Sequence, residues 1–456
     1  MDFDAIVIGS GQAGNPLSQR LADLGWHVAL IERGPLGGTC INTGCTPTKT
    51  MVASAQVAHY ARNAARWGVR ASAVSVDLPA IVARKNKVVE HFRSGQERNA
   101  AKRKTLRLYR GQAQFTGPHS VEVAGESLAS QKIFIDVGAS PTIPRIPGLD
   151  AAGYLTNVSI MELEAVPQHL VILGAGYIGL EFGQMFARFG SRVTVVHRGA
   201  QILSYEDPDI ASALQQILEC EGLRFVLNAE TTRIAHTAEG PQLELTTPQG
   251  PQQISGSHLL VAAGRTPNTA ALGLDKAGIE TNSAGFIRVN PRLETSVPGV
   301  WALGDVKGGP AFTHISYNDY QIVWANLIDG KNQTTENRYV PYAVFTDPQL
   351  GRVGFTEKEA REKKYRLKIG TIPMAHVSRA IERDETAGMM KLIVNAADDR
   401  ILGAAILATE GGELVQLLGV TILAGAPYTL LKGAVYIHPT LAEGFFGLMD
   451  SVKPVD

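Results

Sequence analysis

Cysteine is scarce in this chain, with only three cysteines among its 456 residues. A secreted fold held together by disulfides would carry many more, so the sequence argues against that class of protein. Charge of one sign is also lacking, because 43 lysines and arginines balance 43 aspartates and glutamates. A net charge of zero gives no indication of a nucleic acid or an acidic membrane as partner.

Long hydrophobic runs are missing too. The stretch Gly403–Ala408 is followed closely by Glu410, well before the roughly 20 apolar residues that a membrane-spanning helix needs. The N-terminal segment Met1–Ile8 carries acids where a signal peptide carries basic residues, and its apolar run stops at Gly9. We therefore expect a cytoplasmic protein without a signal peptide or membrane span. Its length predicts about three domains.

A dinucleotide-binding pattern opens the chain: a short apolar strand, a glycine-rich turn, a helical pattern, and a second strand that ends in an acid. The residues of this pattern are Ile6–Ile8, Gly9, Gly11, Gly14, Val28–Ile31 and Glu32. Such glycines allow a tight turn and a close approach of the pyrophosphate, while the acid binds ribose hydroxyls. The helix that follows presents its positive N-terminus to the phosphates.

The same pattern occurs a second time. Its residues are Val171–Leu173, Gly174, Gly176, Gly179, Val193–Val196 and His197. Eighteen residues separate Gly14 from Glu32, and eighteen also separate Gly179 from His197. The sequence therefore predicts two bound dinucleotides, which must differ to make chemical sense together: a flavin in one site and a hydride donor in the other.

The second pattern differs from the first at the position of the acid. Where the first has Glu32, the second has His197 followed by Arg198. An acid would repel a ribose 2′-phosphate, whereas a His-Arg pair offers it cationic donors. This favours NADPH over NADH, although the two residues would also suit an ordinary surface turn.

Two of the three cysteines, Cys40 and Cys45, lie five residues apart behind a glycine-rich run. On an ideal helix their Cα atoms would be roughly 8 to 9 Å apart, beyond the ~7 Å limit for a disulfide. A redox disulfide here therefore needs a distorted turn, which Gly44 and Pro47 permit. The alternatives are two buried structural thiols or a zinc site. No further cysteine or histidine cluster has zinc-ligand spacing, so we expect no metal site.

Several segments carry a resemblance to a known family. Gly37–Lys49 closely resembles the active-site signature of the class I pyridine nucleotide-disulfide oxidoreductases, which include dihydrolipoamide dehydrogenase, glutathione reductase and mercuric reductase. Val261–Asn268 resembles the crossing between their nucleotide domains, Trp301–Asp305 their flavin-ribityl segment, and His438–Glu443 their C-terminal acid-base signature. The resemblance covers essentially the whole chain and is nearest to mercuric-reductase-like and dihydrolipoamide-dehydrogenase-like members.

The resemblance implies an α/β fold with two Rossmann-like dinucleotide-binding domains and a C-terminal α+β dimerisation domain. The expected bounds are 1–147 and 267–339 for the FAD domain, 148–266 for the NAD(P)H domain and 340–456 for the interface domain. It also implies a homodimer whose active site is shared between the subunits. From the charge balance and the short apolar runs, we expect neither nucleic acid nor membrane as partner.

The resemblance also implies roles for residues around the two thiols. Cys45 would face the flavin, and Cys40 would be the interchange thiol that meets the substrate. We expect Cys40 to lie at a helix start and to gain thiolate character there. Lys49, one helical turn beyond Cys45, would sit near the flavin and pair with Glu181. Tyr177 would cover the nicotinamide pocket.

Other roles follow from the remaining segments. His438 would supply the proton that a thiolate product needs, and Glu443 would orient its imidazole. Gly304 and Asp305 would hold the flavin ribityl chain, and Gly264 would lie in the crossing beside the cofactors.

The predicted function is transfer of electrons from NAD(P)H through FAD to the Cys40–Cys45 disulfide and on to a small disulfide or other oxidised sulfur compound. A metal ion or a reactive oxidant is the alternative acceptor, weakened for metals because the chain lacks a second C-terminal cysteine pair. A flavin-bound redox sensor or a non-catalytic subunit of a complex is an alternative of another class. Cys220 is expected to be a packing residue, and a role for His376 stays open.

Overall fold

The computed structural model describes residues 2–455, and the chain forms two compact units. The segments of the first unit are Met1–Met51, Ala80–Thr142 and Gly264–Arg338. The segments of the second unit are Val52–Pro79, Ile143–Ala263 and Tyr339–Asp456. The division into three domains expected from the sequence stays a prediction.

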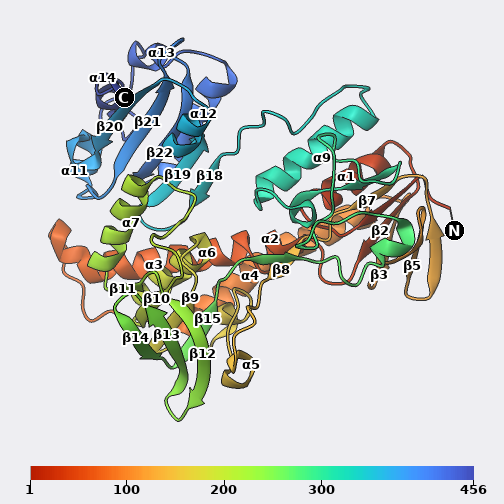
Figure 1. Ribbon diagram of the computed structural model, residues 1–456, viewed down its shortest axis with the longest axis horizontal. Coiled ribbons are helices and arrows are strands. Elements are labelled where there is room, and N and C mark those ends of the chain that lie inside the picture. Colours follow the sequence, from red (N-terminus) through yellow and green to blue (C-terminus); the bar gives the residue numbers. More distant parts are fainter. Residues whose placement is uncertain (1, 456) are drawn as a thin grey trace. The chain divides into compact units, whose positions relative to one another are not determined.

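The first unit is built on a parallel sheet of five strands in the order β17-β7-β1-β2-β3. Figure 1 labels three of them, β7, β2 and β3. These strands are β1 (Ala5–Ile8), β2 (Val28–Glu32), β3 (Leu106–Arg110), β7 (Ile133–Ile135) and β17 (Val300–Ala302). The apolar run that forms β1 is buried at every position, as expected of a central parallel strand covered on both faces.

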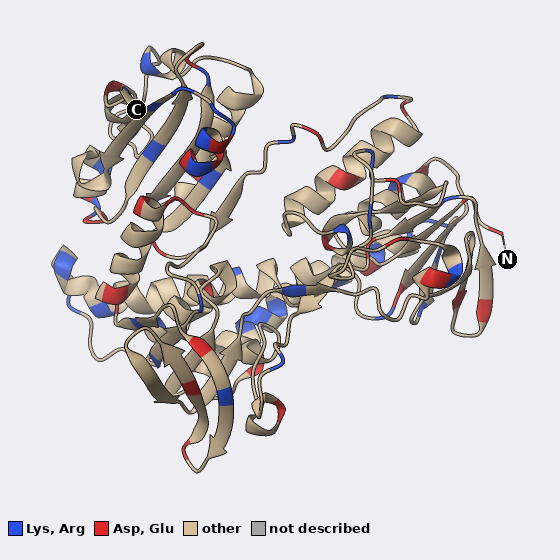
Figure 2. Ribbon diagram, in the orientation of Figure 1, with Lys and Arg blue, Asp and Glu red and all other residues tan. Residues whose placement is uncertain are grey.

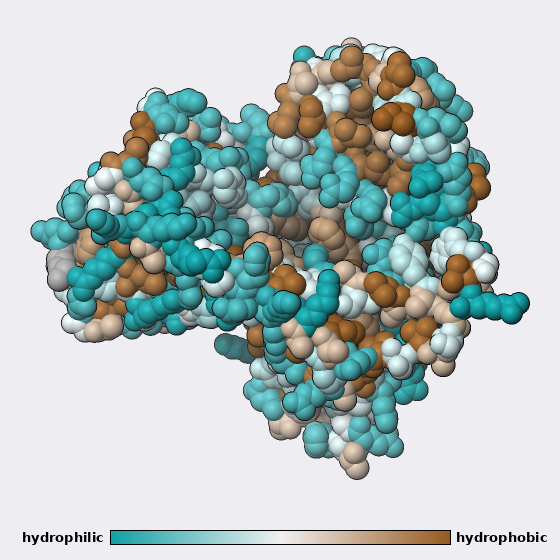
Figure 3. Space-filling model, turned by 180° about the vertical axis from the view of Figure 1, so that it is seen from behind, coloured by the Kyte–Doolittle hydropathy of each residue, from teal (hydrophilic) through white to brown (hydrophobic). Residues whose placement is uncertain are grey.

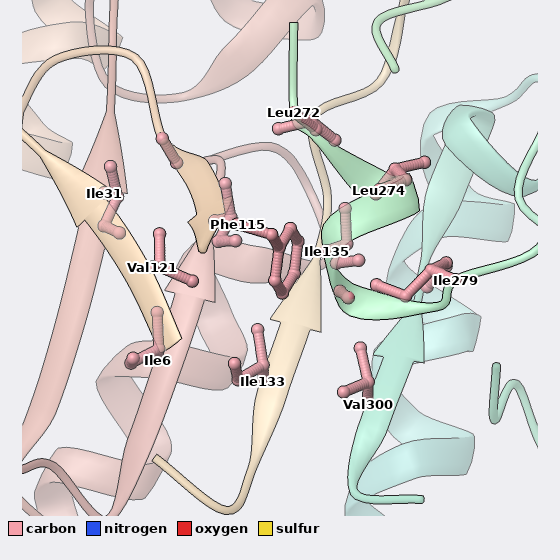
Figure 4. Close-up of a cluster of buried hydrophobic side chains, with 14 of the residues drawn as sticks. Ile6, Ile31, Phe115, Val121, Ile133, Ile135, Leu272, Leu274, Ile279 and Val300 are labelled. Atoms are coloured by element: carbon pink, nitrogen blue, oxygen red, sulfur yellow. The ribbon is translucent and has the colours of Figure 1, made fainter. Parts of the chain in front are cut away.

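Alternate residues of β1 face two different hydrophobic cores, because successive side chains of a strand point to opposite faces. Ala5 and Val7 belong to a core shared with helices α1 (Gly14–Asp23) and α9 (Thr313–Leu327). Ile6 and Ile8 belong to the core on the other face, drawn in Figure 4. That core is closed by an antiparallel sheet and a short helix, namely β4 (Gln114–Gly117), β5 (Ser120–Val123), β6 (Glu126–Ala129) and α8 (Leu274–Ala277).

The remaining elements of the first unit lie around the carboxyl ends of these strands or connect the two units. They are α2 (Gly38–Asn42), η3 (Gly304–Lys307) and the two-stranded sheet of β8 (Ala139–Pro141) and β16 (Arg265–Pro267). Helix α3 (Cys45–Asn63) begins in the first unit and continues into the second, and helix α4 (Leu78–Ala101) leads the chain back.

The second unit contains another parallel sheet, in the order β11-β10-β9-β15. Its strands are β9 (His169–Leu173), β10 (Arg192–Val196), β11 (Leu223–Val226) and β15 (His258–Val261). Helices α6 (Tyr177–Phe189) and α7 (Pro208–Cys220) pack on it. The other elements of this part are η1 (Ala64–Trp67), α5 (Leu149–Ala152), η2 (Ser159–Glu162), β12 (Glu230–Thr237), β13 (Gly240–Thr247) and β14 (Gly250–Ser255).

The C-terminal part of the second unit is a six-stranded antiparallel sheet in the order β18-β19-β22-β21-β20-β23. Its strands are β18 (Tyr342–Val344), β19 (Gln349–Gly354), β20 (Leu367–Pro373), β21 (Met389–Asn395), β22 (Ile401–Ala408) and β23 (Lys453–Val455). Its helices are α10 (Glu357–Glu362), η4 (Met374–His376), α11 (Ser378–Glu382), α12 (Gly411–Leu423), α13 (Thr429–Lys432) and α14 (Gly444–Asp450). Helix α12 packs on β19 and β22, and α14 on β20 and β21.

The expected fold class is confirmed, since two Rossmann-like parallel sheets precede a C-terminal α+β part. Acidic and basic residues are interspersed over both units, as Figure 2 shows. Among the described helices, none combines the length and the hydropathy that a membrane crossing requires. The expectation that Cys220 packs in a core is wrong: it ends α7 with an exposed side chain, because the buried stripe of that helix runs through Ile210, Leu214 and Leu218.

Candidate active site

The first glycine turn joins β1 to α1 and leaves no room for side chains. Gly9 has φ +100°, and a Cβ there would lie 2.2 Å from the carbonyl oxygen of Asp136. A Cβ on Gly14 would lie 2.2 Å from the carbonyl oxygen of Gly9, so the helix can pack this close only with glycine. At the end of β2, Glu32 accepts hydrogen bonds from the backbone N–H of Ser10 (2.9 Å) and from its hydroxyl (2.8 Å).

The fit of this turn to a dinucleotide rests on the backbone that the glycines leave uncovered. A Cβ on Gly11 would lie 2.7 Å from Asp136 Oδ2, and one on Gly38 would lie 2.8 Å from the Cα of Gly11. Two chain segments thus meet backbone to backbone at the start of α1, beside the carboxylate of Glu32. Such a cradle fits the pyrophosphate and ribose of a dinucleotide such as FAD.

A buried acidic cluster lies at η3, where the sequence places the ribityl segment. Gly304 has φ +67° and donates its N–H to Asp319 Oδ2 at 2.9 Å. Asp305 lies 3.3 Å from Arg265 Nε. Burial raises the pKa of Asp305, while the positive charges of Arg265 and Lys307 act in the opposite direction.

The crossing segment begins at Gly264, whose φ of +120° again suits glycine. Its carbonyl accepts a hydrogen bond from the N–H of Thr142 at 2.9 Å, next to the short β8–β16 sheet. This pairing fixes where the chain passes back into the first unit.

The two cysteines lie on separate helices, because the chain leaves the helical conformation between them. Helix α2 ends at Asn42, Thr43 has φ −145° and ψ 14°, and α3 begins at Cys45. The predicted break in the helix at this place is therefore present. The Cys40–Cys45 disulfide stays a prediction.

The expected position of Cys40 at a helix start is wrong. Cys40 is the third residue of the five-residue α2, whereas Cys45 is the first residue of the 19-residue α3. The positive end of a helix dipole therefore favours thiolate at Cys45. A hydrogen bond with Cys45, followed by burial, raises the pKa of Cys40.

Two neighbours act in the opposite direction on Cys40. A hydrogen bond with Thr313 and the positive charge of Lys49 both lower its pKa. The Thr313 hydroxyl also lies 3.1 Å from Cys45 Sγ, where either group can donate. Thr313, the first residue of α9, therefore contacts both sulfurs.

Lys49 lies one turn beyond Cys45 on α3, as the spacing predicts. Its expected partner Glu181 is a buried residue of α6 in the second unit and accepts a hydrogen bond from the N–H of Phe345 at 2.9 Å. The Lys49–Glu181 pair stays a prediction.

The second glycine turn joins β9 to α6 with the same geometry as the first. Gly174 has φ +112°, and a Cβ there would lie 2.3 Å from the carbonyl oxygen of Ala262. A Cβ on Gly179 would lie 2.1 Å from the carbonyl oxygen of Gly174, whereas beside Gly176 the described chain leaves open space. Tyr177 is the first residue of α6, directly after the turn, and it is half-buried. These residues fit a second dinucleotide.

His197 and Arg198 follow the end of β10, where the acid of the first pattern stands. The N–H of Ala175 lies 3.5 Å from His197 Nδ1, which ties the ring to the glycine turn. Burial and then the charge of Arg198 lower the pKa of His197. Arg198 is the exposed member of the pair, and the expectation that both residues donate to a 2′-phosphate stays a prediction.

His438 and Glu443 lie together in the second unit. His438 Nδ1 is 2.8 Å from Glu443 Oε2, and the imidazole side chain is 71% exposed while the carboxylate is 13% exposed. The anchored carboxylate thus orients a ring whose other nitrogen faces outward. This geometry suits an imidazole that exchanges protons with a group outside its own segment.

Sequence reasoning missed two residues of the first unit, Thr313 and Asp136. Asp136 directly follows β7 beside β1, so a signal existed: polar residues at the carboxyl ends of neighbouring parallel strands gather at one edge. Thr313 gave no such signal, because it follows a loop and its approach to the thiols depends on tertiary packing.

Comparison with known proteins agrees with this geometry. Residues 3–319 match the family model of the pyridine nucleotide-disulphide oxidoreductases, and residues 340–447 match the dimerisation domain of the same family. The chain is 38% identical over 459 residues to the probable pyridine nucleotide-disulfide oxidoreductase RclA of Escherichia coli K12, covering 99% of each chain. Mercuric reductase of Bacillus cereus is 35% identical over 443 residues, covering 97% of this chain and 70% of that protein.

A solved structure supports the same relationship. The Cu(II) complex of the HOCl-induced flavoprotein disulfide reductase RclA from Escherichia coli matches with a TM-score of 0.90 at 38% identity, covering 99% of this chain and 100% of that one. The chain therefore belongs to the pyridine nucleotide-disulphide oxidoreductases, flavoenzymes that use FAD and a pyridine nucleotide.

Proposed function

We propose that this chain is an NADPH-dependent reductase whose Cys40–Cys45 dithiol reduces a small disulfide or another oxidised sulfur compound. The observation that carries the proposal is the thiol pair itself: two hydrogen-bonded cysteines at a break between two helices, with Thr313 and Lys49 beside them. An inert structural pair would need neither the charge of Lys49 nor a position at a helix N-terminus.

FAD, when bound, supplies the two-electron chemistry that links a nicotinamide hydride to a dithiol. The residues that would hold it are the first glycine turn with Glu32, and the segment of Gly304 and Asp305. The residues that would hold the pyridine nucleotide are the second glycine turn with Tyr177, His197 and Arg198. The exposed Arg198 supports a 2′-phosphate ligand, and hence NADPH, because a guanidinium binds phosphate in a bidentate manner.

The dithiol would reduce a disulfide by two exchange steps. Cys40 Sγ attacks one substrate sulfur, which forms a mixed disulfide and expels the first product thiolate. Cys45 Sγ then attacks Cys40 Sγ, which closes the Cys40–Cys45 disulfide and expels the second product thiolate. Each expelled thiolate takes up a proton. Two electrons thus leave the dithiol and enter the substrate.

The raised pKa of Cys40 creates a need for a base, because the thiolate is the attacking species. His438, oriented by Glu443, fits this role and can afterwards return the proton to the leaving thiolate. We propose that this imidazole comes from the partner subunit of a homodimer, as the match of residues 340–447 to the dimerisation domain supports.

The test is anaerobic reduction of the flavoprotein by NADPH and by NADH, followed by turnover with a panel of disulfides. Cys40→Ser is expected to abolish disulfide turnover and to leave NADPH-driven quinone reduction intact, because quinones react without the dithiol. Cys220→Ser, which removes the exposed third thiol, is the matched control and should change neither rate. Undiminished disulfide reduction by Cys40→Ser would refute the dithiol route, and faster flavin reduction by NADH would refute the coenzyme preference.

A second candidate acceptor is a metal ion or a reactive oxidant. The relatives favour it: one is a mercuric reductase, and the RclA structure is that of an HOCl-induced reductase in complex with Cu(II). Within residues 2–455, no group of three or more His, Cys, Asp or Glu side chains is arranged to hold a metal ion. Mercuric and cupric ions therefore join the panel, and turnover with them but not with disulfides would favour this candidate.

A redox sensor or a non-catalytic subunit is the proposal of a different class. Neither role needs the hydrogen-bonded pair of His438 and Glu443. Steady NADPH consumption with any acceptor counts against this class, and lack of turnover across the whole panel would favour it.

A further inference from the structure

A buried carboxyl group lies directly under the first glycine turn. Asp136 follows β7, is only 6% exposed, and its Oδ2 accepts hydrogen bonds from the N–H groups of Gly14 (2.7 Å) and Ala13 (3.3 Å). These two N–H groups belong to the N-cap residue and the first residue of α1, the part of the fold that binds a pyrophosphate in dinucleotide-binding proteins.

The carboxyl group lies close to two backbone segments. A Cβ on Gly11 would lie 2.7 Å from Asp136 Oδ2, and a Cβ on Gly304 would lie 2.8 Å from Asp136 Oδ1. One oxygen of the carboxyl group thus lies next to the glycine turn, and the other lies next to the start of η3. Any charge that the carboxyl group carries acts directly on the phosphate-binding backbone.

Asp136 differs from the neighbouring Asp305 and Asp319, because among the described residues no lysine or arginine forms an ion pair with it. Asp305 is paired with Arg265, and Asp319 with Lys307 (3.2 Å) and Arg338 (2.6 Å). On β2, Glu32 accepts hydrogen bonds from Ser10 and Gly34. Among the ion pairs of the described chain, none includes Asp136. Burial, and then the negative charges of Asp305 and Asp319, raise its pKa against the two backbone hydrogen bonds.

We propose that Asp136 is a positioning residue for the FAD pyrophosphate and that FAD binding takes up a proton on its carboxyl group. The inference rests on the proposed placement of FAD at this turn. An ionised Asp136 would hold a third negative charge beside the two of the pyrophosphate, in a site that excludes water. The protonated carboxyl removes this repulsion and offers an O–H donor instead.

The proposal fixes the sign of a pH effect. If binding takes up one proton, FAD affinity falls as pH rises between the pKa of the carboxyl without FAD and its higher pKa with FAD. Within that window the dissociation constant rises about tenfold per pH unit. Below the window the affinity is constant, because the carboxyl is protonated whether or not FAD is bound.

The experiment measures release of FAD from the diluted holoenzyme, by recovery of flavin fluorescence, between about pH 6 and pH 9. The wild type should release FAD more readily as pH rises. Asp136→Asn keeps an oxygen acceptor for Gly14 and cannot ionise. Its FAD release should therefore not vary with pH, and at the alkaline end it should bind FAD more tightly than the wild type. Asp136→Ser, which also removes the charge, provides the same test if the first variant does not fold.

The matched control is Asp23→Asn, at the opposite end of α1. It removes one carboxylate from the same helix, 53% exposed and paired with Arg103 at 2.8 Å, and should keep the wild-type pH dependence. The proposal would be overturned if FAD release from the wild type and from Asp136→Asn changed with pH in parallel. It would also be overturned if the variant bound FAD more weakly at every pH but kept the wild-type pH dependence, because that result indicates a packing role alone. A purified wild type that holds no FAD at any pH would instead refute the placement of FAD itself.

Discussion

Two chemically identical thiols differ here because of where the backbone places them. Cys45 has the first position of a long helix, whereas Cys40 is half-buried in a single turn and shares its hydrogen bond with Cys45. The helix dipole and burial therefore act in opposite directions on the two sulfurs. This asymmetry supports unequal roles in the proposed mechanism, with Cys40 as the thiol that must lose a proton to react.

The hydroxyl of Thr313 should control how readily Cys40 loses that proton. Its hydrogen bond lowers the pKa of Cys40, so Thr313→Val is expected to raise it. A hydrogen bond of about 0.5 to 1.5 kcal/mol corresponds to a roughly two- to twelvefold slower alkylation of Cys40 by iodoacetamide at fixed pH. Peptide mapping of the reduced protein after timed alkylation, in a Cys220→Ser background, measures this rate.

The control is Thr313→Ser, which keeps the hydroxyl and removes only the methyl group. Its rate should match that of Thr313. Equal rates for the serine and valine variants, with both slower, would show that Thr313 acts through packing, and an unchanged rate in the valine variant would remove it from the thiol chemistry.

At the scale of elements, the strand-turn-helix unit requires glycine at Gly9 for two separate reasons: a positive φ and a close approach of another backbone segment. Gly9 and Gly25 both have positive φ, +100° and +88°, but only at Gly9 would a Cβ overlap backbone, that of Asp136 at 2.2 Å. Gly25→Ala should cost about 1 to 3 kcal/mol of backbone strain and keep the flavin. Gly9→Ala adds the overlap and should lose both FAD and further stability, as flavin content and thermal unfolding would show. Equal loss of FAD and of stability in both variants would mean that the turn relaxes around a methyl group.

The same elements show what the sequence can and cannot predict. Apolar runs bounded by glycine located β1, β2, β9 and β10, because parallel strands buried on both faces leave a continuous hydrophobic signal. The helix break before Cys45 also followed from local rules. Spacing alone could not assign Cys40 and Cys45 to two helices. The roles drawn from the resemblance placed the helix start at Cys40, whereas the long helix α3 begins at Cys45.

The residues of the site that local sequence patterns did not predict lie where segments distant in sequence meet. Thr313 lies 268 residues from Cys45 in sequence, and Asp136 lies 122 residues from Gly14. Such contacts arise from the strand order β17-β7-β1, which no short window contains. The lowered pKa of His197 could not be predicted for a related reason, since burial causes it and burial is a property of the folded unit.

At the scale of the whole molecule, exposed apolar side chains gather in the C-terminal part of the second unit, and Figure 3 shows hydrophobic surface there. They are Leu417, Val420, Leu423, Leu430, Val435, Ile437 and Phe446. Contiguous exposed apolar surface is typical of an interface between proteins. Because this part matches the dimerisation domain, we infer that it meets a second copy of the chain.

Val435→Asp tests whether the dimer completes the active site. Val435 is 97% exposed and stands three residues before His438, so a charge there should dissociate the dimer without disturbing a core. If His438 serves the thiols of the partner subunit, disulfide turnover should fall about 10²-fold or more as the proton acceptor is lost. NADPH-driven quinone reduction needs only one subunit and should persist.

Leu24→Asp, at a 52% exposed residue of the first unit, is the control and should stay dimeric and active. A monomeric Val435→Asp variant with full disulfide turnover would show that each chain uses its own imidazole or none.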